Sequence, residues 1–263
     1  MLDIAGNTIF LTDSGGDRPA LLFVHGIMMS HEVWRHQVAA FAGDYRVVCV
    51  DLRGFGRSSA TTPEISFEDH ADDLAHVIAQ LGLTDVTLVG WSMGGAIGQV
   101  FAAAYPHILA RLVLVDTTPQ LLASDNFPHA LPVEAAMQLG QLLGSDFAQG
   151  CAAFSGMIAP EDAAATQLVT GIAAATRPAV ALAAFANSGP RSLIELLPKI
   201  TTPTAVIAGA DDRICLPDAS RYLADHIPGC TQPVAWIKDA GHAPFLTRPA
   251  EFNAALRAAL TGP

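Results

Sequence analysis

A strand-like run that ends in a glycine and continues directly into a helix constrains this chain more than any other feature. Residues 86–89 are apolar or β-branched, and residues 96–104 have the composition of a helix. Between them, Gly90 and Gly94 each lie two positions from Ser92. A turn this sharp strains the backbone at its apex, so the residues two positions away must be small. The pattern therefore predicts a strand, a tight turn and a helix, with the Ser92 hydroxyl raised clear of the sheet beside a helix N-terminus.

Apolar runs that alternate with helical segments predict the rest of the architecture. Five further runs are expected to be strands, at residues 20–24, 46–50, 111–116, 204–209 and 233–237. Helices are expected over residues 34–41, over residues 66–81 with a cap at Ser66, and from Pro249 onwards. Residues 2–13 favour an edge hairpin with its turn at Gly6 and Asn7. This alternation is typical of an α/β fold with a mostly parallel central sheet flanked by helices.

The segment from residue 119 to residue 198 interrupts the alternation. It is rich in Ala, Leu and Gly, has helical stretches and no strand pattern, and is too long for a simple crossover. We therefore expect a helical cap over residues 119–198, inserted into a core domain formed by residues 1–118 and 199–263.

The composition of the chain limits the kinds of partner it can bind. The 263 residues are 51% hydrophobic and 15% charged, which is typical of a well-buried globular protein. A net charge of −11 argues against nucleic acid and anionic membranes as partners. The four cysteines are scattered, residues 1–7 show no secretory signal, and no apolar run has the length of a membrane span. We expect a cytoplasmic protein with reduced thiols; the oligomeric state is left open.

A serine hydroxyl becomes a good nucleophile only beside a base that a third group orients. Of the nine histidines, His242 is the one that follows a late strand in a loop shaped by Gly241 and Pro244. Because functional sites in such sheets lie beyond the carboxyl ends of the strands, this loop should return over Ser92.

Three acids are candidates for the orienting group. Asp212 follows the strand expected at 204–209, and the chain order Ser92, Asp212, His242 is the order of nucleophile, acid and base expected for a G-x-S-x-G turn. Asp116 ends an earlier strand and is the alternative. Asp211 is expected to face solvent or to cap the loop.

These segments together resemble the α/β-hydrolase fold family over nearly the whole chain. The resemblance implies that Ser92 is the nucleophile, His242 the base and Asp212 its orienting acid. It also implies an oxyanion hole formed by the backbone N–H groups of Ile27 and Met93, and a helical cap where the strand pattern is absent. The matching pieces are residues 25–26, 51–58, 90–95, 209–212 and 241–242.

Within that family, a serine nucleophile argues against haloalkane dehalogenases and epoxide hydrolases. Carbon–carbon bond hydrolases commonly carry Asn before the serine and Trp after the histidine, where this chain has Trp91 and Ala243. The segments around Ser92 and His242 resemble lactonases, including acyl-homoserine-lactone hydrolases, and residues 34–58 resemble enol-lactonases. The resemblance favours a serine hydrolase of small neutral carboxylic esters or lactones.

The expected substrate pocket includes Met28 and Trp91, with Met93 beside them. The cap segment has only Arg177 and Arg191 as basic residues, which disfavours a polyanionic substrate.

Other functions remain open. One is a carbon–carbon bond hydrolase, another a cofactor-free lyase, perhydrolase or oxygenase on the same residues, and a third a small-molecule receptor on a hydrolase scaffold. No cofactor or metal is expected. Residues 31–36 lack the spacing of a zinc-binding helix, and Gly54 and Gly56 lack the remainder of a nucleotide-binding loop.

Overall fold

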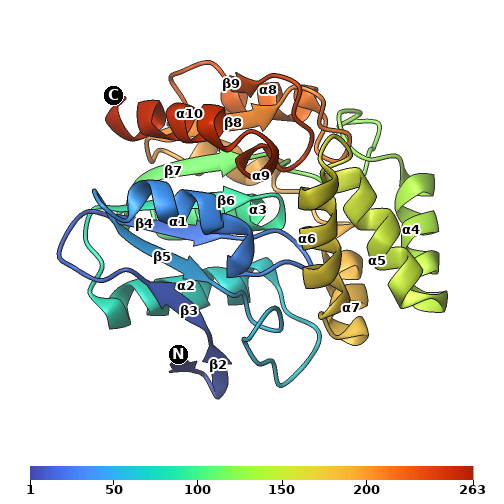
Figure 1. The fold of residues 1–263 in the computed structure, drawn as a ribbon. Helices are drawn as coiled ribbons and strands as arrows, with labels where there is room; N and C mark the ends of the chain where they lie inside the picture. Colours follow the sequence, from blue (N-terminus) through green and yellow to red (C-terminus); the bar gives the residue numbers. More distant parts are fainter. Residues whose placement is uncertain (263) are drawn as a thin grey trace.

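A seven-stranded sheet forms the centre of the computed structural model, which describes residues 1–262 (Figure 1). Strand β3 is antiparallel to β5, and the other neighbouring pairs are parallel. The mostly parallel α/β sheet predicted from the sequence is therefore confirmed. In spatial order the strands are β3 (Leu11–Asp13), β5 (Arg46–Val50), β4 (Ala20–Val24), β6 (Val86–Trp91), β7 (Leu109–Val115), β8 (Thr204–Gly209) and β9 (Ala235–Ile237).

The predicted strand bounds agree with the structure for three strands and differ by up to two residues for others. Strands β4, β5 and β8 have the predicted bounds, whereas β7 begins at Leu109, two residues earlier than expected, and β9 begins at Ala235, two residues later. The N-terminal hairpin is formed by β1 (Leu2–Ile4) and β2 (Asn7–Ile9) alone. Its turn is at Ala5 and Gly6, not at Gly6 and Asn7, because both turn residues adopt positive φ, at 50° and 75°. Residues 11–13 leave the hairpin and pair with β5 instead.

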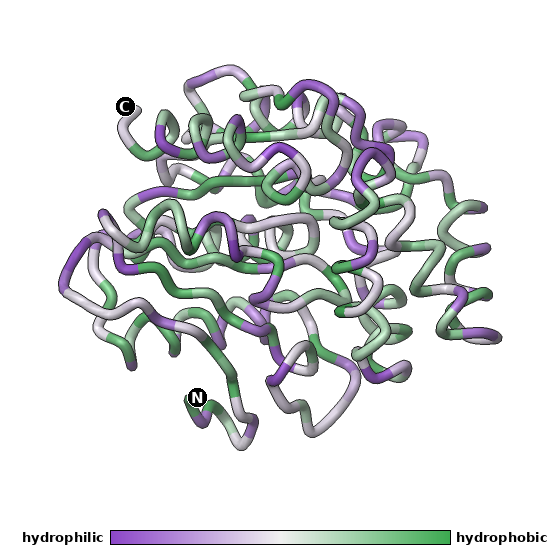
Figure 2. Tube along the Cα trace, viewed as in Figure 1, coloured by the Kyte–Doolittle hydropathy of each residue, from purple (hydrophilic) through white to green (hydrophobic). Residues whose placement is uncertain are grey.

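Helices cover both faces of the sheet. Helix α1 (Arg35–Phe41), which follows the short 3-10 helix η1 (His31–Trp34), contacts α10 (Pro249–Thr261). Helix α2 (Phe67–Leu81) contacts α3 (Met93–Ala104), and α8 (Pro217–His226) contacts β8. Figure 2 shows that the central strands are the most continuously hydrophobic part of the chain, as expected for a sheet covered on both sides.

The predicted helix start at Ser66 is confirmed in detail. The Ser66 hydroxyl accepts a hydrogen bond from the Asp69 amide at 3.0 Å, and the Asp69 carboxylate accepts one from the Ser66 amide at 2.9 Å. The Ser66 hydroxyl also donates a hydrogen bond to the Asp69 carboxylate at 2.6 Å, and this bond, with the one from the Ser66 amide, lowers the pKa of Asp69. The helix ends at Gly82, which has a φ of 58°.

Helices occupy most of the long connection between β7 and β8, and they lie beyond the carboxyl ends of the parallel strands (Figure 1). Residues 119–198 contain no strand, only isolated bridges. The division into a core (1–118 and 199–263) and a cap (119–198) stays a prediction about domains. We use the name cap segment for residues 119–198. Its helices are α4 (Val133–Ser145), α5 (Phe147–Ile158), α6 (Ala163–Ala174) and α7 (Pro178–Ser188), and a 3-10 helix, η2 (Ile194–Lys199), runs across its end.

Within residues 1–262, no single helix has the length and apolar composition needed to cross a membrane. Helices α6 and α7 meet that test only together, and they are bent by 104° at their junction.

Candidate active site

The strand, turn and helix around Ser92 are built as the sequence predicts. Ser92 links β6 to α3 with φ 54° and ψ −119°, a backbone conformation that residues other than glycine rarely adopt. A Cβ atom on Gly90 would overlap the carbonyl of Gly94, and one on Gly94 would overlap the carbonyl of Val24. The two glycines are therefore required for α3 to begin so close to the ends of β6 and β4.

The loop after β4 is held against Ser92 by a buried histidine. His25 accepts a hydrogen bond from the Leu52 amide at Nε2 (2.9 Å), and its Nδ1 lies 2.7 Å from the Gly26 carbonyl. This arrangement requires the neutral ring protonated at Nδ1, and burial lowers the pKa of His25 accordingly. A Cβ on Gly26 would lie 3.1 Å from Ser92 Cβ, so the backbone that leads into Ile27 passes directly beside Ser92.

His242 and Asp212 form a buried pair. Nδ1 of His242 is 2.8 Å from Oδ2 of Asp212, and their side chains are 1% and 0% exposed. The second carboxylate oxygen, Oδ1, accepts hydrogen bonds from the amides of Ile214 (2.8 Å) and Cys215 (3.1 Å). Both oxygens are engaged, so the carboxylate cannot rotate away from the imidazole without losing these bonds.

The structure places the other two candidate acids elsewhere. Asp116 is fully buried, and its Oδ1 accepts a hydrogen bond from the Gly209 amide at 2.8 Å. Burial raises the pKa of Asp116 well above its usual value, and the negative charge of Asp212 raises it further. Asp211 is exposed.

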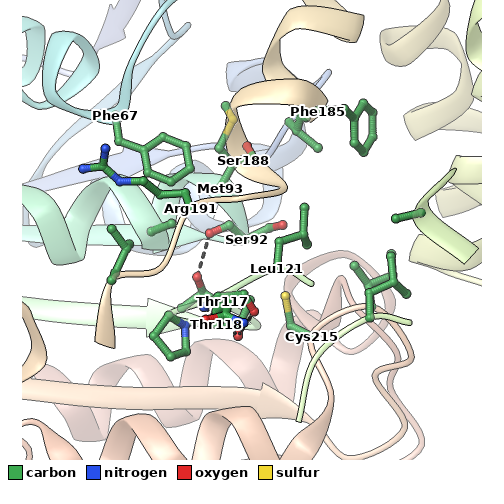
Figure 3. Close-up of a pocket in the computed structure, with 18 of the residues that line it drawn as sticks. Phe67, Ser92, Met93, Thr117, Thr118, Leu121, Phe185, Ser188, Arg191 and Cys215 are labelled. Carbon is green, nitrogen blue, oxygen red and sulfur yellow. Dashed lines mark hydrogen bonds between the residues drawn. The ribbon is translucent and has the colours of Figure 1, made fainter. Parts of the chain in front are cut away.

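A cavity of about 760 Å³, a volume that includes space open to solvent, lies between Ser92 and the cap segment. Figure 3 shows Ser92 facing it, with Phe67 and Met93 on the core side and Leu121 and Phe185 from the cap segment. The remaining lining is mostly apolar. It includes Ile27, Thr117, Thr118, Gln120, Leu131, Leu139, Phe154, Met157, Ser188, Arg191, Leu193, Ile214 and Cys215.

Two residues expected at the pocket do not line the cavity. Trp91 is 1% exposed, and its ring packs against those of Phe245 and His242. Its Nε1 donates a hydrogen bond to the His242 carbonyl at 2.7 Å, which ties the His242 loop to the residue beside Ser92. Met28 is completely buried, with a φ of 60°.

Cys215 is one of the residues at this site that the sequence analysis missed. It lines the cavity three positions after Asp212, and that spacing is the signal that could have identified it. Among residues 1–262, Asp212, Cys215 and His242 are the one group whose potential ligand atoms gather closely enough for a metal ion, within 4.8 Å of one another. Burial raises the pKa of the Cys215 thiol well above its usual value, and the nearby carboxylates raise it further. This disfavours the thiolate that binds metals.

Comparisons with known proteins identify proteins similar to this chain. The pimeloyl-[acyl-carrier protein] methyl ester esterase of Aeromonas hydrophila is 32% identical over 244 residues, covering 90% of this chain and 93% of that protein. The 3-oxoadipate enol-lactonase 2 of Acinetobacter baylyi is 28% identical over 264 residues, covering 98% and 94%.

The solved structure of an esterase from Exiguobacterium antarcticum superposes on this fold with a TM-score of 0.91, at 23% identity and over 99% of this chain and 98% of that one. The family described as the alpha/beta hydrolase fold matches residues 19–249. Because that match spans most of the chain, the protein belongs to the α/β-hydrolase fold family.

Proposed function

We propose that this protein hydrolyses small neutral carboxylic esters or lactones through Ser92, His242 and Asp212. The observation that carries the proposal is the buried 2.8 Å contact between His242 and Asp212. The backbone of His242 is also hydrogen-bonded to Trp91, the residue that precedes Ser92. A neutral imidazole that donates from Nδ1 to Asp212 has a lone pair on Nε2, which is the form a general base requires.

The chemistry follows from these positions. Ser92 Oγ attacks the ester carbonyl while His242 Nε2 takes its proton, and the imidazolium that forms is stabilised by Asp212. The oxyanion accepts hydrogen bonds from the N–H groups of Met93 and Ile27. Met93 is the first residue of α3, so its N–H has no partner within the helix. His242 then protonates the leaving alkoxide, and water hydrolyses the acyl-enzyme by the same steps.

The lining of the cavity supports an uncharged substrate. Among the described lining residues, Arg191 is the one charged side chain, and it is already ion-paired with Glu68. An acyl group with several carboxylates would therefore be desolvated without compensating cations. Two relatives bear the names of a methyl ester esterase and an enol-lactonase, which is consistent with esters and lactones as the substrate class.

The test is a comparison of kcat/KM for an acyl lactone, a matched linear ester and a vinylogous diketone. Replacing Ser92 with Ala should lower kcat by roughly 10³-fold or more without unfolding the protein. Ser188→Ala is the matched control, because it removes another hydroxyl from the same cavity, and its kcat should stay within about threefold of the wild type.

Two outcomes would contradict the proposal. A tenfold preference for the diketone, about 1.4 kcal/mol in transition-state binding, would indicate a carbon–carbon bond hydrolase instead. Tight binding of the lactone without turnover would indicate a receptor.

A further inference from the structure

The backbone of the His242 loop, residues 240–243, is held from two sides. On the core side, the Ala240 carbonyl accepts a hydrogen bond from the Asp211 amide at 3.0 Å, and the His242 carbonyl accepts one from Trp91 at 2.7 Å. These contacts attach the loop to the end of β8 and to the residue before Ser92.

The cap segment provides the other two contacts. The amide of His242 donates to the carbonyl of Ile158, the last residue of α5, at 3.0 Å. The neighbouring amide of Gly241 donates to Oε1 of Glu161, in the turn between α5 and α6, at 2.7 Å. A hydrogen bond to a carboxylate is shorter and roughly twice as strong as one between neutral groups.

The fit between the loop and this turn is close. A Cβ on Gly241 would lie 3.1 Å from the second carboxylate oxygen of Glu161 and 3.3 Å from the Ile158 carbonyl. On the other side, a Cβ on Gly209 would overlap the Gly241 carbonyl. The loop is therefore confined between the end of β8 and the cap segment.

The turn between α5 and α6 is held in place by hydrogen bonds of its own. The Asp162 carboxylate accepts a hydrogen bond from the Ala165 amide at 2.9 Å and caps α6. The Thr166 hydroxyl donates to the Ala159 carbonyl at 2.7 Å. Two adjacent carboxylates thus have different tasks, because Asp162 stabilises the cap helix while the side chain of Glu161 is free to reach Gly241.

We propose that Glu161 is a positioning residue, which holds the His242 loop through the Gly241 amide and so makes the placement of the base depend on the cap segment. This inference rests on the proposed function. Without the α5–α6 contacts, the loop would lose two of its hydrogen bonds, and His242 would keep only its bonds to Asp212 and Trp91. The cap segment thus contributes to placing the base through the loop backbone, not through a side chain on the reacting atoms.

The test compares three variants. Glu161→Ala removes the acceptor, Glu161→Gln keeps an oxygen acceptor without the charge, and Asp162→Ala is a matched control that weakens α6 but leaves the Gly241 contact. We expect Glu161→Ala to lower kcat by about tenfold with KM changed less than threefold. Glu161→Gln should restore kcat to within about threefold of the wild type, and Asp162→Ala should also stay within that range.

Amide hydrogen exchange of Gly241 gives a second readout that needs no substrate. In Glu161→Ala, the Gly241 and His242 amides should exchange about tenfold faster, while the amides of β8 stay unchanged. Unchanged exchange at Gly241, or equal losses of kcat in Glu161→Ala and Asp162→Ala, would overturn the proposal. If wild-type protein cleaves no ester, the proposed function fails, and the exchange data still decide whether Glu161 holds the loop.

Discussion

The exchange of Asp212 for Asn tests the candidate site most directly, because the structure dictates how the new amide must orient. Oδ1 of Asp212 accepts two backbone N–H groups, from Ile214 and Cys215. The asparagine must therefore keep its oxygen at that position, which turns its NH₂ group toward His242. Two donors cannot face each other, so the imidazole has to present a bare Nδ1 and carry its proton on Nε2. In that tautomer His242 cannot accept the proton of Ser92.

The expected loss in kcat is about 10⁴-fold, or about 5 kcal/mol in the activation free energy. Asp116→Asn is the control, since the asparagine oxygen can still accept the hydrogen bond from the Gly209 amide, and kcat should change less than about threefold. The assay is steady-state hydrolysis of a chromogenic ester, with circular dichroism to confirm folding. A larger loss in Asp116→Asn than in Asp212→Asn would refute the reasoning.

Other predictions concern pH and metal ions. Burial lowers the pKa of His70 to about 3, so between pH 6.5 and pH 5 this side chain takes up a proton only on unfolding. The contribution of His70 to the free energy of unfolding is therefore fully present above about pH 6.5 and falls by roughly 2 kcal/mol on acidification to pH 5; urea unfolding should show a weaker pH dependence in His70→Leu. EDTA should leave activity unchanged, and loss of activity that a divalent cation restores would reveal a metal requirement.

The centre of the fold could be predicted from the sequence because its signals are local. A buried parallel strand such as β4 needs a continuous apolar run, and the helix start at Ser66 needs only two polar side chains three positions apart. The turn at Ser92 could also be predicted from nearby residues alone, since any residue larger than glycine at position 90 or 94 would overlap the backbone.

Features that depend on distant contacts could not be predicted in this way. Sequence gave no indication that Trp91 would bond the carbonyl of His242, 151 positions later, instead of lining the cavity. The pairing of His242 with Asp212 instead of Asp116 is set by how β8 and β9 end in three dimensions, and the order of residues favoured it without excluding the alternative. The contacts of Glu161 with the His242 loop likewise link segments 80 positions apart.

The backbone at Ser92 has a consequence for how this protein can be evolved or engineered. A residue other than glycine at φ 54° and ψ −119° carries strain of about 1 to 3 kcal/mol, which glycine would relieve in part. A library selected for thermostability alone should therefore tolerate or enrich glycine at position 92 and lose the hydroxyl. Selection for stability and selection for turnover therefore favour different residues at position 92. Experiments that select for stability need an activity screen from the first round.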